Sequence, residues 1–504
     1  MTAYKGQGTM DALLISLNAL ISPTLLAAAF GGVLWGIIGG ALPGISPSIT
    51  MALLLPFTYG MDPTTGIVLL AATYVGAEYG GSIPAILINT PGTNAAAATV
   101  LDGYAMNQKG LAGEALGISL ACGVVGGLFG LALLVGLTQP LAKLALMFTP
   151  PAYFALGILG ISVIATLNEG SLVKALISAV IGLMIATIGS DPFSGVNRFT
   201  FGRPELLDGI PYILIMIGVY ALSELYMQAG EPGWEKPKKF VSVKLPRWTM
   251  WKRIWPATAI GSVIGGFEGI TPGAGGTVAA FLAYNETRRW SKHPEEFGRG
   301  APEGVAGPET ANNVVACSAL IPTLSFGIPG SNSTAVLLGG LLLHGLVPGP
   351  LLFTQHPDVI YGLFGGLFTA NLAMIPLGIL IMTPCLWLVT QPKPLLSAGI
   401  YALIFTGIFS INNDSFDIGL ALIAAVLGYG LKYFKFPFLP LVLGTILGYM
   451  LESSFRRALL MSNNDYSTFV TDPIAGGMLA VACLFVAGSI GRSWWVSRRQ
   501  GAAA

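Results

Sequence analysis

Uncharged stretches far longer than a single helix recur along the chain. Residues 12–61 and 310–357 contain no Asp, Glu, Lys or Arg. A transmembrane helix needs about 20 predominantly apolar residues, so each stretch is long enough to cross a bilayer more than once. The pattern predicts an all-α polytopic membrane protein with roughly 10–14 membrane segments.

The candidate segments are apolar runs separated by Gly, Pro or charged residues. Several are too short to cross a bilayer alone, which predicts half-helices or re-entrant hairpins beside full spans. The segments lie near residues 20–41, 48–60, 63–80, 112–138, 151–167, 172–189, 209–228, 255–280, 311–328, 333–347, 358–390, 397–411, 416–430, 436–451 and 470–490.

Composition narrows the class of protein. Hydrophobic residues make up 53% of the 504 positions and charged residues 10%, whereas soluble proteins carry about 25% charged residues. The formal net charge of +1 gives no reason to expect a nucleic-acid partner. The four cysteines are far apart and lie in apolar segments, so we expect neither disulfides nor a metal site from them. The lipid bilayer is therefore the expected environment.

One basic stretch divides the chain into two halves. Residues 229–254 hold seven Lys and Arg residues. Excess positive charge marks cytoplasmic loops, so we expect a cytoplasmic linker here, with a first repeat half in residues 1–228 and a second in residues 255–504. A second hydrophilic stretch, residues 288–307, mixes both signs and is predicted to be a loop.

The two halves carry similar motifs in the same order. Residues 44–47 read Gly-Ile-Ser-Pro, and residues 269–272 read Gly-Ile-Thr-Pro. Residues 84–94 and 322–332 each run from Pro to a second Pro seven positions later, followed by Gly, a hydroxyl residue and Asn. The second of these motif regions continues with Ser and Thr to residue 334. Two matching pairs indicate an internal duplication.

Each motif predicts a break in a membrane helix. Ser46 is suited to cap a new helix that begins at Pro47, and Thr271 with Pro272 repeats that arrangement. The helix before each break loses partners for its last carbonyl groups. Such groups are costly in hydrocarbon, so the breaks must face protein, water or an ion.

These breaks are suited to two kinds of ligand. Carbonyl and hydroxyl oxygens favour a hard cation such as sodium, with candidates Gly44, Ser46, Asn89, Pro91, Asn94, Gly269, Thr271, Gly327, Pro329 and Asn332. Amides at helix starts favour a carboxylate, and paired broken helices are typical of a transporter's binding site. The candidate substrate-binding residues are Ser46, Thr93, Asn94, Thr271, Ser331, Asn332, Ser333 and Thr334. The alternative is that the breaks are packing kinks without a ligand.

At these residues the chain resembles the TctA family, the large membrane subunit of bacterial tripartite tricarboxylate transporters. The resemblance extends from about residue 15 to residue 490. It rests on Gly-Ala-Leu-Pro-Gly-Ile-Ser-Pro at 40–47, Tyr-Gly-Gly-Ser-Ile-Pro at 79–84, Asn-Thr-Pro-Gly at 89–92, Leu-Asp-Gly-Tyr at 101–104, Gly-Pro-Glu-Thr-Ala-Asn-Asn at 307–313 and Gly-Ile-Pro-Gly at 327–330.

The resemblance implies a multi-pass protein of the bacterial inner membrane that works with a small membrane subunit and a periplasmic solute-binding protein. It also implies uptake of small carboxylates such as citrate, driven by a sodium or proton gradient. The tips at 93–94 and 331–334 are similar to those of sodium-coupled dicarboxylate carriers. That similarity implies an inverted repeat and an elevator-like motion.

Three glutamates are candidates for proton coupling, and two other functions were considered. Glu78, Glu268 and Glu309 lie in or beside the motif regions, and an intramembrane carboxylate is a candidate proton acceptor. Alternatively, the three glutamates lie at a membrane boundary or in a loop and have no role in coupling. An anion channel is a rival function, although paired half-sites favour alternating access. An intramembrane enzyme is a weaker rival because no catalytic motif is present, and no cofactor is expected apart from the coupling ion.

Overall fold

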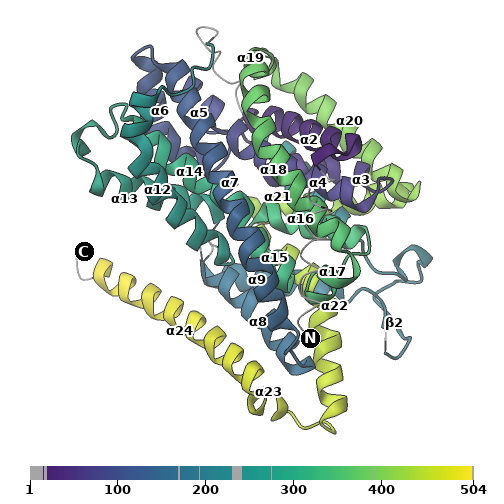
Figure 1. The fold of residues 1–504 in the computed structure, drawn as a ribbon. Coiled ribbons are helices and arrows are strands. Elements are labelled where there is room, and N and C mark those ends of the chain that lie inside the picture. The colour runs from purple at the N-terminus through teal and green to yellow at the C-terminus, as the bar shows by residue number, and fades with distance from the viewer. Residues whose placement is uncertain are drawn as a thin grey trace. The chain divides into compact units, whose positions relative to one another are not determined.

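The computed structural model describes residues 15, 20–167, 171–191, 193–229, 241–273, 275–389 and 391–501. Within these residues the fold is helical, apart from a two-stranded antiparallel sheet of β1 (Gly189–Ser190) and β2 (Asn197–Arg198) (Figure 1). The chain forms two compact units that alternate along the sequence. Residues 1–142 and 224–413 make unit 1, and residues 143–223 and 414–504 make unit 2.

Unit 1 contains most of the broken helices. Its first segment has α2 (Pro23–Ala41), α3 (Pro47–Thr58), α4 (Pro63–Gly80), α5 (Ser82–Ile88), α6 (Ala96–Gln108) and most of α7 (Ala112–Ala145). Its second segment has α11 (Ser223–Gln228), α12 (Trp248–Ile270), α13 (Gly275–Trp290), η3 (Pro294–Glu296), α14 (Pro302–Ser318), α15 (Leu320–Phe326), α16 (Asn332–Leu343), α17 (Pro350–Gln355), α18 (Pro357–Leu380), α19 (Met382–Val389) and α20 (Lys393–Asn412).

Unit 2 is built from fewer and mostly longer helices. Its elements are α8 (Pro150–Leu167), α9 (Leu172–Ala186), the β1–β2 sheet, η1 (Pro204–Leu206), α10 (Tyr212–Met216), η2 (Ile217–Leu222), α21 (Ser415–Tyr433), α22 (Phe438–Met461), α23 (Thr468–Thr471) and α24 (Pro473–Gly501). Helix α22 packs against α8 and α9, and α24 continues as one long helix (Figure 1).

Eight helices of the described residues are long and apolar enough to cross a membrane: α2, α7, α8, α18, α20, α21, α22 and the part of α24 up to residue 491. Four shorter apolar segments are Pro47–Thr58, Leu172–Ala186, Tyr212–Gln228 and Asn332–Leu343. The expected 10–14 segments counted half-helices as well as full spans, and among the described residues the structure has eight helices of full length beside these four shorter ones.

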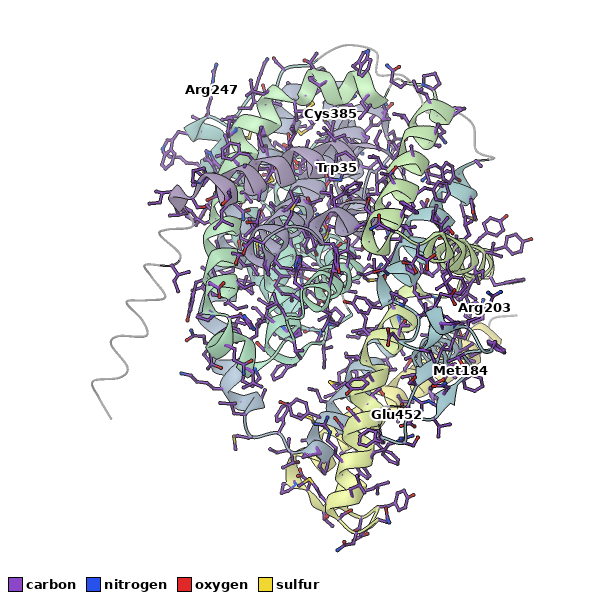
Figure 2. All side chains as sticks on the ribbon, turned by 90° about the vertical axis from the view of Figure 1, so that its right-hand side faces the viewer. Trp35, Met184, Arg203, Arg247, Cys385 and Glu452 are labelled. Atoms are coloured by element: carbon purple, nitrogen blue, oxygen red, sulfur yellow. The ribbon has the colours of Figure 1, made fainter. Side chains whose placement is uncertain are left out.

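Close contacts position the broken helices in unit 1. Glycines let α2 approach α4, since a Cβ at Gly36 would lie 2.3 Å from the carbonyl oxygen of Thr73. The indole nitrogen of Trp35 donates a hydrogen bond of 3.1 Å to the Thr50 carbonyl and thereby joins α2 to α3 (Figure 2). The first break is therefore held on both sides by packed helices.

An ion-pair cluster attaches the β1–β2 sheet of unit 2 to α22. Arg456 donates to both carboxylate oxygens of Asp191 at 2.9 and 2.8 Å, and Arg198 lies 2.7 Å from Glu452, which Figure 2 labels. The backbone amide of Phe193 also donates to Asp191 at 2.8 Å. This amide, followed by the other donors, lowers the pKa of the Asp191 carboxyl to about 2.

Two sequence-based predictions of element boundaries were wrong. The expected span 255–280 is divided between α12 and α13, because the chain breaks after Ile270. The stretch 288–307 is not one loop, since α13 continues to Trp290 and α14 starts at Pro302. The first half of α14 contains polar residues, so its hydrophobicity pattern did not predict a membrane helix there.

This charged stretch is also held within unit 1. Arg253 of α12 pairs with Glu296 and, at 2.8 Å, with Glu303. The guanidinium of Arg253 holds the pKa of Glu296 below its usual range. Residues 230–240 of the predicted basic linker lie outside the described residues, and the rest of the linker runs into α12, which begins at Trp248.

Candidate functional site

Each half of the chain contains a matching pair of Pro-Gly breaks. The first is Pro43-Gly44 between α2 and α3, and the counterpart in the second half is Pro272-Gly273 between α12 and α13. Both glycines have the left-handed backbone that favours glycine, with φ of +84° at Gly44 and +89° at Gly273. The second breaks are Pro91-Gly92 and Pro329-Gly330, and they precede α6 and α16.

The second break of each half contacts the last turn of the helix that precedes the first break. A Cβ on Gly92 would lie 2.0 Å from the carbonyl oxygen of Gly40, and a Cβ on Gly330 would lie 3.3 Å from that of Gly269. Gly40 and Gly269 thus hold corresponding positions in the two contacts. The sequence motifs instead align Gly269 with Gly44. Gly40 precedes Gly44 by four residues, which is about one helical turn.

The structure confirms one predicted helix cap and contradicts another. Ser46 caps α3, and its hydroxyl accepts a hydrogen bond of 3.4 Å from the amide of Ile49. Thr271 does not cap a new helix, because it is the C-terminal cap of α12 and its hydroxyl donates to the Phe267 carbonyl at 3.0 Å. The next helix starts only at Gly275.

The first-half tip follows the seven-residue helix α5. Asn89 ends that helix with a left-handed backbone, φ 55°. The amide of Gly92 then donates 3.0 Å to the carbonyl of Gly81, which folds the tip back against the start of α5. Thr93 is buried and accepts from the amide of Ala96 at 3.3 Å, whereas Asn94 is exposed.

The second-half tip has similar geometry. Gly327 ends the seven-residue helix α15 with φ +72°. Ser331 caps α16 in a reciprocal arrangement with Thr334, in which each side chain accepts from the backbone amide of the other. Ser333 and Thr334 are buried, and Asn332 is exposed. Asn94 and Asn332 are therefore accessible at helix starts.

Helices of one half reach residues of the other. The hydroxyl of Tyr74 on α4 lies 3.3 Å from that of Ser331 at the second tip. Asn312 of α14 donates 2.9 Å to the carboxylate of Glu78 on α4, while its Oδ1 is buried without a hydrogen-bond partner. A Cβ on Gly276 would lie 2.3 Å from that oxygen. The unpartnered oxygen thus faces the start of α13.

The three candidate glutamates have different surroundings. Glu309 is 2% exposed, and both its carboxylate oxygens accept hydrogen bonds, from Thr99 and, at 2.9 Å, from Ser119. Glu78 is also buried and is held by Asn312. Glu268 is only partly buried on the last turn of α12. The structure places Glu78 and Glu309 inside the helix packing, where side-chain donors hold them.

Asp102 is a buried carboxylate that was not predicted as a site residue, although it lies in one of the motifs shared with the family. It accepts hydrogen bonds from the Tyr284 hydroxyl at 3.0 Å and from the amides of Gly300 and Ala301 at 2.7 and 2.8 Å. Asp102 therefore anchors the chain immediately before α14, the helix that carries Glu309 and Asn312. An acidic residue inside an otherwise apolar helix was the available signal.

Taken together, the fold is that of a multi-pass helical membrane protein whose apolar helices are interrupted at paired Pro-Gly breaks, as in transporters with discontinuous helices. Residues 26–443 match the tripartite tricarboxylate transporter TctA family, and the chain belongs to that family. It is accordingly a transporter membrane subunit rather than an enzyme, and proteins of this family act with other subunits of a tripartite transporter.

Two relatives come from Agrobacterium vitis. The "Uncharacterized 52.8 kDa protein in TAR-I ttuC' 3'region" is 38% identical over 482 residues, which cover 94% of this chain and 95% of the relative. The "Uncharacterized protein in TAR-II ttuC' 3'region" is 37% identical over 222 residues, which cover 44% of this chain and 92% of that relative. No solved structure matches the chain.

Proposed function

We propose that the chain is the translocating subunit for uptake of tricarboxylates or other small carboxylates across the bacterial inner membrane, driven by a sodium or proton gradient. A small membrane subunit and a periplasmic solute-binding protein would complete the transporter. The observation that carries the proposal is the contact of the second Pro-Gly break of each half with the helix end before the first break, at Gly92 with Gly40 and at Gly330 with Gly269. Paired interruptions of this kind build ligand sites in secondary transporters.

The order of elements supports an internal duplication, which we propose to be an inverted repeat. Each half has a long helix, a break at a left-handed glycine, a second helix, then a helix that leads into a seven-residue helix and a second break. Each half also contributes one segment to unit 1 and a following segment to unit 2. A duplicated chain in which both copies divide at the same point would have this arrangement.

An elevator-like cycle is supported by the distribution of the candidate residues. The four matched Pro-Gly breaks and the three candidate glutamates belong to unit 1. In the proposed cycle, unit 1 carries substrate and ion together, and unit 2 serves as the scaffold. Loading a cation with the anion lowers the net charge that must pass through the low-dielectric layer, which lowers the cost of the movement.

The tips supply groups for both ligands. The N-terminal ends of α6 and α16 carry the positive end of the helix dipole, which attracts a carboxylate. Asn94 and Asn332 are exposed at these helix starts and offer carboxamide groups. Sodium would take oxygen ligands from Asn side chains and from backbone carbonyls of the breaks.

The test is uptake by cells that produce the full chain with its two partner subunits, using a panel of labelled citrate, other di- and tricarboxylates and aromatic acids. We expect saturable uptake of at least one carboxylate, and its loss in Asn94→Ala and Asn332→Ala. Asn197→Ala, at an exposed asparagine of unit 2, is the matched control and is expected to transport normally. Normal uptake in both tip variants would refute the site, and no uptake of any tested acid would refute the substrate class.

A further inference from the structure

Glu309 lies where α14 meets α6 and α7 inside unit 1. Its carboxylate accepts a hydrogen bond from the hydroxyl of Thr99 on one oxygen and from the hydroxyl of Ser119 on the other. The ion pairs found among the described residues do not include Glu309. A carboxylate that is 2% exposed is therefore held by hydroxyl groups in place of a cation.

The hydrogen bonds continue beyond Ser119. Its hydroxyl oxygen lies 2.6 Å from that of Ser82, the first residue of α5. The hydroxyl of Ser82 is in turn 2.8 Å from the carbonyl oxygen of Tyr79 on α4. A chain of hydroxyl groups thus leads from the carboxyl of Glu309 to a backbone acceptor at the junction of α4 and α5.

This series of hydroxyl groups can form its hydrogen bonds with both the ionised and the protonated form of Glu309. When Glu309 is ionised, Ser119 donates to it and Ser82 donates to Ser119. When Glu309 carries a proton on Oε2, its O–H donates to Ser119, Ser119 donates to Ser82, and Ser82 donates to the Tyr79 carbonyl. Because hydroxyl groups rotate freely, each proton has an acceptor in both states. Thr99 donates to Oε1 throughout.

We propose that Glu309 is the proton-binding site of the transporter, and that Ser119 and Ser82 hold its side chain in both the charged and the neutral form. The inference rests on the proposed function and gives the location of proton binding, which is separate from the sodium ligands proposed at the tips. Proton uptake makes the buried side chain neutral, which lowers the cost of keeping it in a low-dielectric environment. The site is separate from the helix tips, so it leaves them available to the substrate.

The groups around Glu309 limit what else can titrate with it. On α4, Glu78 and Tyr79 interact electrostatically with Glu309, and on α7 Cys122 does so. Glu78 is a like charge on a neighbouring helix, so proton binding at the two glutamates is coupled.

Two other helices packed against α14 also carry acidic groups, Asp102 on α6 and Glu268 on α12. Asp102 of α6 binds Tyr284 of α13 and the amides at residues 300 and 301. Glu268 lies on the last turn of α12. Glu309 differs from Asp102 and Glu268 in that it binds a series of hydroxyl groups whose hydrogen bonds can reverse direction.

The experiment is an infrared titration of the purified full chain in lipid vesicles, with no substrate present. A buried neutral carboxyl gives a carbonyl stretching band that disappears when it ionises. We expect such a band in the unmodified protein at mildly acidic pH, its loss at mildly alkaline pH, and the absence of this titrating component in Glu309→Gln. The Gln side chain is suited to replace the neutral form because its amide donates to Ser119 while its oxygen accepts from Thr99.

Two further variants make the result decisive. Glu295→Gln, which removes an exposed carboxylate, is expected to keep the band. Ser119→Ala removes one hydrogen bond and is expected to shift the band and its titration midpoint, which tests the site even if Glu309→Gln does not fold. An unchanged titrating band in either Glu309→Gln or Ser119→Ala would overturn the proposal, as would a band that persists at all pH values. Because transport is not measured, such a failure would leave the proposed uptake function untouched.

Discussion

The carboxamide of Asn312 donates a hydrogen bond of 2.9 Å to the carboxylate of Glu78 and joins α14 to α4 inside unit 1. The two residues are separated by 234 positions in the sequence, and both are buried. The other atom of the carboxamide, Oδ1, lacks a hydrogen-bond partner and faces the start of α13. This contact ties the two sequence halves together beside the helix breaks.

Removing the donor of this pair should destabilise the protein more than neutralising the acceptor. Asn312→Ala leaves a buried carboxylate oxygen without its partner, which costs about 1–3 kcal/mol. Glu78→Gln keeps an oxygen that accepts from Asn312 and should cost less. Thermal unfolding of both variants in the same detergent measures the difference. Wild-type stability of Asn312→Ala would contradict the assigned contact.

The helix breaks should differ in their tolerance of a methyl group. In Gly92→Ala the new Cβ would lie 2.0 Å from the backbone oxygen of Gly40, so the tip must move. In Gly330→Ala the corresponding distance to Gly269 is 3.3 Å, which small adjustments can relieve. We expect a clearly lower melting temperature for Gly92→Ala than for its matched partner. Equal or reversed effects would show that the two tips are not packed as described.

Acid should destabilise unit 2 through Asp191. Its folded-state pKa of about 2 lies below the ordinary value of about 3.9, so its contribution to stability is fully present above the ordinary pKa. That contribution is lost as the pH falls from the ordinary value through the folded-state value. Asp191→Asn should therefore unfold at a lower temperature than the unmodified protein at neutral pH, and the difference should shrink in acid.

The control for this pH dependence is Asp208→Asn, which changes an exposed carboxylate of the same connecting segment. Melting temperatures of the three proteins across an acidic pH series measure the effect. A difference between Asp191→Asn and the unmodified protein that stays constant with pH would argue against the lowered pKa.

Sodium binding at the tips predicts a ligand-specific gain in stability. A ligand at 10–100 times its dissociation constant stabilises the state it binds by about 1.5–3 kcal/mol. We therefore expect a higher melting temperature in sodium than in potassium or choline at equal ionic strength and pH, and no such gain in Asn94→Ala or Asn332→Ala. If sodium has no effect on the unmodified protein, the proton alone becomes the candidate coupling ion.

Much of the architecture follows from local patterns. Long uncharged stretches predicted membrane helices because the bilayer demands about 20 apolar residues for each span. The Gly and Pro motifs predicted interruptions, and Ser46 was identified as a helix cap from its place before Pro47. The ordered motifs also predicted the family, which the match over residues 26–443 confirms. Such features depend on neighbouring residues alone, so one sequence is enough to read them.

The tertiary structure decided which residues meet. The sequence motifs align Gly44 with Gly269, but in the structure Gly40 contacts Gly92 and Gly269 contacts Gly330, each from the last turn of the helix that precedes the first break. Likewise, Asn312 meets Glu78 only when α14 lies against α4. A buried polar group is stable only with a partner, and that partner can be more than 200 residues away in the chain. The sequence therefore determined where the helices break, whereas their packing determined which groups the breaks and the buried carboxylates face.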